Sequence, residues 1–162
     1  MQTAPTPAAL LKLLNVAEAA GQIIRDMKDR SGTLKADGSL VTEADFASNK
    51  ILTQGIHEHL GIDMPILSEE VSKSTEEIKS FGRGFAVIID PLDGTTNYLH
   101  GYPYYCVSIA LAVKGVLTLG VVYDPAHNDL FTAERGGGAF LNERRIRVGK
   151  RTQLTDCLVS TG

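Results

Sequence analysis

The chain has 162 residues, of which 43% are hydrophobic and 22% are charged, a composition typical of one globular domain with its own core. Its formal net charge of −3 at pH 7 argues against binding to nucleic acid or to an anionic membrane surface. We therefore expect no nucleic-acid and no membrane partner. An anionic substrate would have to be met by a local feature, such as a metal ion or a helix N-terminus.

Two cysteines, Cys106 and Cys157, are too few for a disulfide framework or a thiolate zinc site. Two reduced thiols are the ordinary state of cysteines in an intracellular protein. The N-terminus lacks the basic region and apolar run of a signal peptide, and no segment is apolar over the length needed to span a membrane. The sequence therefore predicts a cytoplasmic protein.

Residues 1–7 are rich in threonine and proline and are expected to be a disordered lead-in to a domain over residues 8–162. Apolar residues then recur at helical spacing over 10–27, which predicts an amphipathic helix. The polar stretch 29–39 contains two glycines and predicts a loop. A second helix is predicted to end near residue 60. Thr42 and Asp45 stand three residues apart at its start, as in a capping box.

After Pro65 the pattern becomes extended. A short continuous apolar run predicts a strand buried on both faces, and two further strands joined at Lys114 and Gly115 predict an antiparallel hairpin. Two helices followed by strands indicate an α+β fold, with two helices packed on a mostly antiparallel sheet. The predicted strands are 85–89, 107–113, 116–123, 129–133 and 139–148, and the apolar end 158–162 also resembles a strand.

Acidic residues cluster at three places in the sequence: Asp45 at a helix start, Glu69–Glu70 after an extended stretch, and Asp90 with Asp93 after the buried strand. Carboxylates that converge repel one another and persist only with protons or cations. Oxygen ligands without histidine or cysteine select Mg²⁺, Mn²⁺ or Ca²⁺ over zinc. Two such ions suit phosphoryl transfer because they can act on both the attacking and the leaving oxygen.

The segment 90–97 carries further features of a binding site. Pro91 prevents the strand from continuing regularly, and Gly94 permits close approach of the backbone to a ligand. The carbonyl of Leu92 could add a metal ligand, and residues 94–96 could present N–H groups to a phosphate if a helix begins there.

Each piece also has a simpler interpretation. Asp45 alone fits a helix cap, Glu69–Glu70 fits a solvated pair, and 90–94 fits a turn because Asp, Pro and Gly all favour turns. The aromatic run 98–105 fits core or interface packing. Spacing alone therefore suggests a metal site without establishing one.

Several motifs along the chain support a metal site. Through these motifs the sequence resembles the inositol monophosphatase family, which comprises magnesium-dependent, lithium-sensitive phosphatases. The motifs occur in the order of the family and cover nearly the whole chain from residue 10 onward. They are Lys35 and the segments 39–45, 66–70, 88–98, 100–103, 107–109, 120–125 and 136–140.

The resemblance implies a set of metal ligands, for two or three Mg²⁺ ions per complete site. By similarity, Glu69, Asp90 and the carbonyl of Leu92 hold the first ion. Asp90 is shared with a second ion, which Asp93 also binds.

The resemblance likewise implies catalytic and substrate-binding roles. Asp45 and Thr95 would orient and deprotonate the attacking water, with Glu70 as an outer contributor. The substrate would contact the segment of Leu92, Asp93, Gly94 and Thr95, with backbone donors from the last two.

The sequence leaves two questions open: which phosphate ester is the substrate, and whether the chain holds the whole catalytic unit of the family. Thr96–Asn97 favours inositol monophosphatases over bisphosphate nucleotidases, but it also occurs in relatives that act on fructose 1,6-bisphosphate. Family members continue into a second, α/β half with a Trp-Asp motif, whereas this chain has no tryptophan. We therefore expect this chain to be the N-terminal half of an enzyme that hydrolyses small phosphate esters. The alternative is a non-catalytic metal-binding fragment. The protein is expected to form a homodimer.

Overall fold

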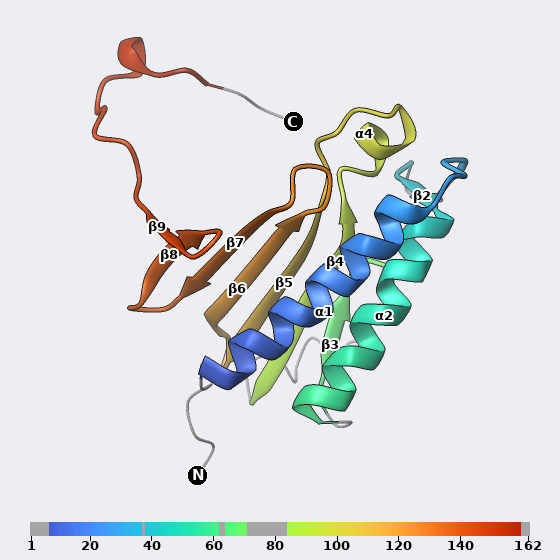
Figure 1. Ribbon diagram of the computed structural model, residues 1–162, viewed down its shortest axis with the longest axis horizontal. Coiled ribbons are helices and arrows are strands. Elements are labelled where there is room, and N and C mark those ends of the chain that lie inside the picture. Colours follow the sequence, from blue (N-terminus) through green and yellow to red (C-terminus); the bar gives the residue numbers. More distant parts are fainter. Residues whose placement is uncertain (1–6, 37, 62–63, 71–83, 160–162) are drawn as a thin grey trace.

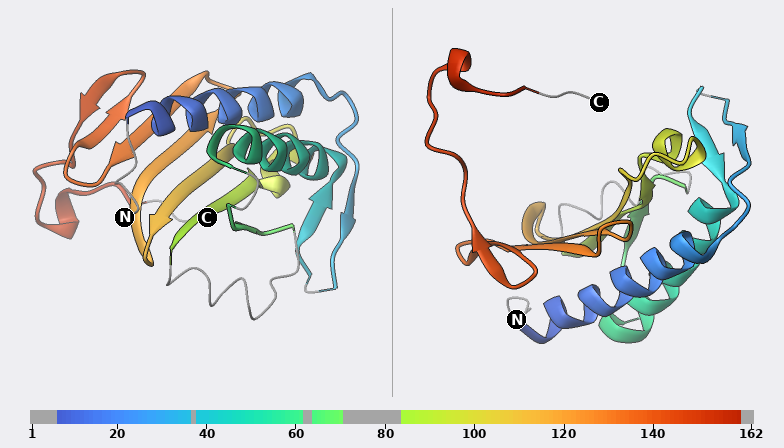
Figure 2. Two further views of the ribbon diagram at one scale, coloured as in Figure 1. Left: turned by 90° about the horizontal axis from the view of Figure 1, so that it is seen from below. Right: turned by 45° about the horizontal axis from the view of Figure 1, so that its top comes forward.

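The computed structural model describes residues 7–36, 38–61, 64–70 and 84–159. Two long helices lie side by side across one face of a seven-stranded sheet (Figure 1). The same face is covered in the other views, whereas the segment after the last strand runs away from the sheet (Figure 2). The predicted α+β fold, with two helices packed on a mostly antiparallel sheet, is confirmed.

Both predicted helices form. Helix α1 spans Pro7–Asp26 and helix α2 spans Glu43–Leu60. The capping box at the start of α2 is confirmed, because the hydroxyl of Thr42 accepts the N–H of Asp45 while the carboxylate of Asp45 accepts the N–H of Thr42. The buried residues of α1 recur every three or four positions and so form one face; they are Leu13, Val16, Ala17, Ala20 and Ile24.

The predicted loop over 29–39 is partly wrong, because it contains a strand. Strand β1 (Gly32–Leu34) pairs antiparallel with β2 (Leu40–Thr42) in a separate two-stranded sheet. The turn between them is closed by two backbone bonds, Lys35 N to Ser39 O at 2.7 Å and Gly38 N to Lys35 O at 3.0 Å. Gly38 has a φ of 87°, which a glycine adopts without strain. Three-residue strands are too short to show an alternating pattern in sequence.

The main sheet has the strand order β3-β4-β5-β6-β7-β8-β9. Only the β3–β4 pair is parallel, and all the later pairs are antiparallel. The predicted hairpin is confirmed, with φ of 51° at Lys114 and 75° at Gly115, as a two-residue turn between twisted strands requires. The strands are β3 Ile66–Ser68, β4 Phe85–Asp93, β5 Cys106–Val113, β6 Val116–Asp124, β7 Asp129–Glu134, β8 Gly138–Leu141 and β9 Arg144–Ile146.

The single strand predicted over 139–148 is wrong, because a turn at Asn142 and Glu143 divides it into β8 and β9. Both turn residues have positive φ, 47° and 66°. The amide of Asn142 stabilises this turn, since it accepts the N–H of Leu130 at 2.8 Å and donates to Asp129 at 2.9 Å. These bonds join residues 12 and 13 positions apart, so a local pattern does not reveal them.

The ends of the chain differ from the sequence prediction in part. Pro7 already belongs to α1, and the rest of the predicted lead-in lies outside the described residues. After β9 the regular structure is limited to the 3₁₀ turn η1, Leu154–Asp156. Leu158 and Val159 lie in no strand, and residues 160–162 are outside the described part. Among the described helices, none is both long and apolar enough to cross a membrane.

The contact between α1 and the sheet depends on a glycine. A Cβ atom added at Gly21 would lie 2.5 Å from Cδ1 and Cε1 of the Tyr123 ring on β6. That ring is held in place because the hydroxyl of Tyr123 bonds Asn128 at 2.9 Å. The helix therefore approaches the sheet more closely than an alanine would allow.

We predict that Gly21→Ala lowers the free energy of unfolding by about 1–3 kcal/mol, the usual cost of overpacking. Replacing glycine by alanine inside a helix ordinarily stabilises a protein by roughly 0.5–1 kcal/mol, so the sign of the effect is diagnostic. Urea unfolding measures it. Gly120→Ala is the control, because a Cβ there meets no atom within 4 Å. A Gly21→Ala chain as stable as the parent would contradict this packing.

Candidate active site

Two of the three acidic segments meet at one edge of the sheet. β3 and β4 run parallel, with Ser68 opposite Ile89, so the chain leaves both strands at the same edge. Glu69–Glu70 follows β3, and Asp90–Asp93 forms the last four residues of β4. The parallel pairing thus places side by side two segments that are about twenty positions apart in the sequence.

The environment of Asp90 at this edge favours its protonated form. Burial is the largest effect that raises the pKa of Asp90, followed by the negative charges of Glu69 and Asp93 and a hydrogen bond with Glu69. The N–H of Leu92 opposes these effects, and the pKa of Asp90 comes to about 7. Below about pH 7 Asp90 is therefore mostly protonated unless a cation lies close to it.

The donor atoms at this edge suit a hard cation. They are carboxylate and carbonyl oxygens, which Mg²⁺ and Mn²⁺ prefer. The neighbouring sulfur of Cys106 lies 3.7 Å from Oδ2 of Asp93. Burial, together with the charges of Asp93 and Asp90, raises the pKa of Cys106 to about 12, so this sulfur remains a thiol and does not offer a thiolate ligand.

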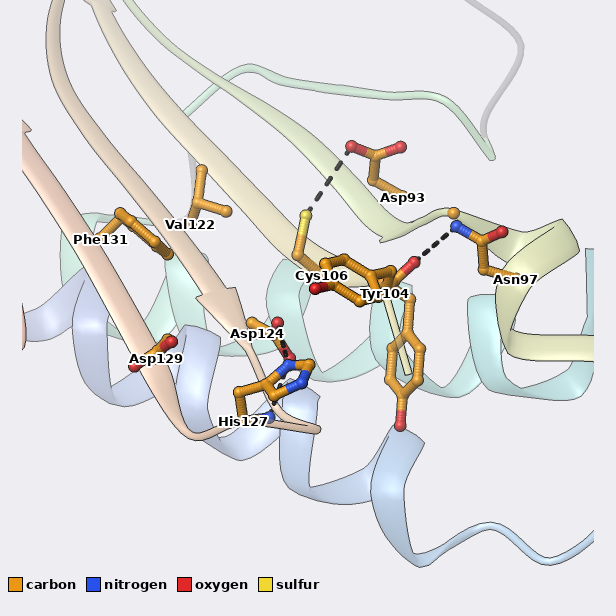
Figure 3. A pocket seen from close by; sticks show the side chains of 11 residues that line it. Asp93, Asn97, Tyr104, Cys106, Val122, Asp124, His127, Asp129 and Phe131 are labelled. Carbon is orange, nitrogen blue, oxygen red and sulfur yellow. Dashed lines mark hydrogen bonds and ion pairs between the residues drawn. The ribbon is translucent and has the colours of Figure 1, made fainter. Parts of the chain in front are cut away.

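The structure brings the predicted metal ligands together only in part. Glu69 contacts Asp90, whereas Asp93 lies at the rim of a neighbouring pocket beside Cys106 (Figure 3). Within the described ranges, no three acidic, histidine or cysteine side chains are gathered closely enough to hold an ion. The carbonyl of Leu92 already accepts the hydroxyl of Thr95 at 3.0 Å, and its second lone pair remains available for a ligand.

Asp45 has two roles that the sequence analysis treated as alternatives. One carboxylate oxygen, Oδ2, accepts the N–H of Thr42 at 2.8 Å and its hydroxyl at 2.6 Å. The other, Oδ1, lies 3.2 Å from the hydroxyl of Thr95. Since Asp45 is only 1% exposed, the cap fixes the carboxylate and leaves one oxygen for Thr95. The predicted pair of Asp45 and Thr95 is thus in contact.

Gly94 is required where it stands. It has φ 88° and ψ 35°, in the left-handed region, and directly precedes the short helix α4, Thr95–Leu99. A Cβ atom there would lie 2.8 Å from the carbonyl oxygen of Tyr104. Conformation and space therefore both exclude a side chain at the point where the chain turns from β4 into α4.

Glu70 is paired with a residue to which the sequence analysis gave no role. Its Oε1 lies 2.8 Å from the ammonium group of Lys35, and the side chain of Glu70 is only 4% exposed. Burial lowers the pKa of Lys35, but the hydrogen bond and charge of Glu70, with the charges of Glu69 and Asp45, outweigh this effect and raise it. The β1–β2 turn is thereby joined to the acidic edge.

The aromatic run 98–105 divides into two parts. Tyr98 and Tyr105 are buried and pack edge to face, with ring centroids 5.2 Å apart. Tyr102 and Tyr104 are more than half exposed and stack at 5.1 Å. The sequence analysis left core and interface open for this run, and the structure assigns the first pair to the core.

Beside Asp93 lies a pocket of about 520 Å³, which the sequence analysis did not predict (Figure 3). Its polar lining includes Asp124, bonded to Nδ1 of His127 at 2.7 Å, and Asp129. The lining residues that the structure describes include three carboxylates and no lysine or arginine. The motifs 88–98 and 120–125 both contribute lining residues, but their spacing gives no indication of a cavity.

Comparison with known proteins identifies the family. Residues 8–162 match the inositol monophosphatase family. An inositol-1-monophosphatase from Rhizobium meliloti is 42% identical over 153 residues, which cover 91% of this chain and 54% of that protein. A putative Nus factor SuhB from Neisseria meningitidis serogroup A is 41% identical over 156 residues, covering 90% of this chain and 56% of that protein.

Solved structures agree with this match. The extragenic suppressor protein suhB from Bartonella henselae superposes with a TM-score of 0.80 at 38% identity, covering 91% of this chain and 56% of that one. An inositol monophosphatase from Anabaena gives a TM-score of 0.74 at 37% identity, covering 90% of this chain and 51% of that one. The chain belongs to the inositol monophosphatase family, and it spans about half the length of the curated relatives it matches.

The raised pKa of Asp90 predicts how stability depends on pH. Its ordinary value is 3.8 and its value in the folded chain is about 7. Between these values the folded chain binds a proton that the unfolded chain has released, so the stability of the metal-free chain should fall as pH rises from about 4 to about 7. Asp90→Asn should lose less stability over this range and should melt at a higher temperature than the parent at pH 8.

Melting temperatures measured in EDTA from pH 5 to pH 8 test this prediction. Asp156→Asn is the control, because it removes an exposed carboxylate of η1 that belongs neither to the acidic edge nor to the described lining of the pocket beside Asp93. If the parent and Asp90→Asn change in parallel with pH, the raised pKa of Asp90 is contradicted.

Proposed function

We propose that this chain forms the metal-binding half of a magnesium-dependent active site that hydrolyses small phosphate monoesters, with inositol monophosphate as the preferred substrate. The observation that carries the proposal is the contact between Glu69 and Asp90, next to the bonded pair of Asp45 and Thr95. A carboxyl pair that suits a cation, near a hydroxyl that is bonded to a buried carboxylate, supports this proposal. Membership of the family supports the phosphatase class.

In this proposal Glu69, Asp90, Asp93 and the carbonyl of Leu92 hold the ions, two or three in a complete site. When bound, magnesium ions supply positive charge that lowers the pKa of the attacking water and stabilises the leaving oxygen. Crowding of like charges at Asp90 is what a cation would relieve, so the donor set fits the metal.

The hydroxyl of Thr95 has one proton and two acceptors within reach, Oδ1 of Asp45 at 3.2 Å and the carbonyl of Leu92 at 3.0 Å. When the hydroxyl donates to Asp45, the lone pairs of its oxygen are free to accept a proton from water. A proton can then move from water to Thr95 while the proton of Thr95 moves to Asp45. The cap bonds to Oδ2 hold the carboxylate still during this transfer.

Glu70 is not part of the proton transfer between Thr95 and Asp45. Its ion pair with Lys35 favours an electrostatic role at the edge over direct proton transfer. The backbone at Gly94 and Thr95 would receive the phosphate, because the family resemblance gives them this role and the first N–H groups of a helix lack helical partners.

The pocket beside Asp93 favours a neutral leaving group. A sugar bisphosphate or a nucleotide bisphosphate would bring a second phosphate next to the three carboxylates of the described lining, which repel it. Hydroxyl groups of a polyol can instead donate to these carboxylates. This contrast supports a monoester of a polyol over the bisphosphate alternatives.

Other properties of the complete protein remain proposals. Exposed and stacked Tyr102 and Tyr104 support a homodimer, because tyrosine is enriched at interfaces. Inhibition by lithium and a cytoplasmic location follow from the family resemblance and the sequence. The expected absence of a nucleic-acid partner stays a prediction, since several relatives are named Nus factor SuhB.

Phosphate release tests the proposed activity. Residues 1–162 should show little turnover of inositol 1-phosphate, because the chain spans about half the length of its relatives. A protein extended at the C-terminus to the length of those relatives should be active, magnesium-dependent and inhibited by lithium. In it, Thr95→Ala and Asp45→Asn should each lower kcat by roughly 10²–10⁴-fold, as expected for removal of a general base.

The control in the extended protein is Thr118→Val, which removes a hydroxyl on β6 that bonds the carbonyl of Leu111. Its kcat should match that of the parent. Efficient hydrolysis by residues 1–162 alone, or inactivity of the extended protein on every phosphate ester tried, would contradict the proposed site. The second result would favour a non-catalytic metal-binding protein.

A further inference from the structure

Helix α2 carries three polar side chains on the face that contacts the acidic edge: Asp45, Ser48 and Asn49. Residues at positions i, i+3 and i+4 share one helix face. The proposed reaction uses only Asp45. Ser48 is 0% exposed, and a polar side chain fully buried among apolar neighbours needs a hydrogen-bond partner to offset its desolvation.

The partner of Ser48 lies in the acidic segment. Its hydroxyl donates to the carbonyl oxygen of Pro91 at 2.7 Å, 43 positions along the chain. That carbonyl sits in a β-bulge, because the pairing of Asp90 with Ser108 is followed by that of Asp93 with Cys106. Two residues of β4 there face one of β5, which interrupts the regular ladder. Ser48 thus bonds β4 at the bulge, where the regular pairing of β4 with β5 is interrupted.

The same peptide group reaches Asp90. The N–H of Leu92, which belongs to the peptide bond with Pro91, donates to Oδ1 of Asp90 at 3.2 Å. A peptide group is planar, so a bond that fixes its oxygen also fixes the direction of its N–H. Ser48 is therefore connected to the carboxylate of Asp90 through one rigid group.

Asn49 makes a matching connection to the other acidic segment. Its Oδ1 accepts the hydroxyl of Ser68 at 2.6 Å, and the oxygen of Ser68 accepts the N–H of Glu70 at 3.2 Å. Ser68 is only 3% exposed, so water competes little for these bonds. Neighbouring residues of one helix thus bond the ends of the two strands, Asn49 to the last residue of β3 and Ser48 to Pro91 near the end of β4.

We propose that Ser48 and Asn49 are positioning residues, which hold the segments 69–70 and 90–93 at a fixed separation by bonding both to helix α2. The proposal rests on the proposed function, in which these segments bind the metal ions. Neither side chain is among the groups proposed to hold the ions or the substrate. A helix is stiff over one turn, so two adjacent anchors on it hold Glu69 and Asp90 in a fixed relative position.

A purely structural role makes a different prediction. If the bond of Ser48 only satisfies a buried carbonyl, its loss should affect stability in the same way as the loss of any similar bond. The chain contains such a bond away from the acidic edge. Thr118 donates to the carbonyl of Leu111 at 3.0 Å, at an irregularity in the pairing between Leu111 and Ala112.

Binding of Mn²⁺ to residues 1–162, followed by the electron paramagnetic resonance of the free ion, separates the two roles. Ser48→Ala and Asn49→Ala should each raise the dissociation constant roughly three- to tenfold, as expected for loss of one intramolecular hydrogen bond. Thr118→Val should change it less than about twofold, within the scatter of independent sites. All measurements are made where circular dichroism shows each variant fully folded. Equal dissociation constants for the parent and Ser48→Ala would overturn the proposal.

Amide hydrogen exchange of the metal-free chain tests the same proposal without an ion. Ser48→Ala should speed exchange at Leu92 relative to amides of β5, because its peptide loses one of two anchors. Thr118→Val should not change this ratio, and unchanged exchange at Leu92 in Ser48→Ala would overturn the proposal. If the parent does not bind Mn²⁺, the proposed metal site fails, while the exchange measurement still decides whether Ser48 positions Asp90.

Discussion

Repulsion between carboxylates at the edge shared by β3 and β4 is the constraint on which the site depends. Parallel pairing of these strands forces Glu69 and Asp90 into contact. A contact of this kind costs free energy unless a proton or a cation stands between the groups. Burial and this repulsion together raise the pKa of Asp90, and binding of a divalent cation is the function that we propose for this arrangement.

Helix α2 organises the residues around that edge. Its first turn is closed by the capping box of Thr42 and Asp45, which leaves one oxygen of Asp45 for Thr95. Its second turn supplies the bonds to Pro91 and Ser68. Helix capping, a structural requirement of every helix, thus also places a buried carboxylate beside the hydroxyl at the start of α4.

The sequence predicted those elements of the fold that depend on a local pattern of residues. Helical periodicity predicted α1 and α2, and Lys114–Gly115 predicted the β5–β6 hairpin, because each depends on residues within a few positions of one another. The resemblance supplied the pairing of Asp45 with Thr95, which are 50 positions apart. It did not supply the ion pair of Lys35 with Glu70 or the bond of Ser48 to Pro91, which join residues 35 and 43 positions apart. Such contacts arise only when distant elements pack.

Proton release on metal binding tests the central claim most directly. If Asp90 holds a proton that a cation displaces, Mn²⁺ binding to the chain near pH 6 should release close to one proton per ion, and less at pH 8. Titration calorimetry in buffers of different ionisation enthalpy measures this number, and Asp90→Asn should abolish the release. Binding of Mn²⁺ with no proton released at pH 6 would contradict the account.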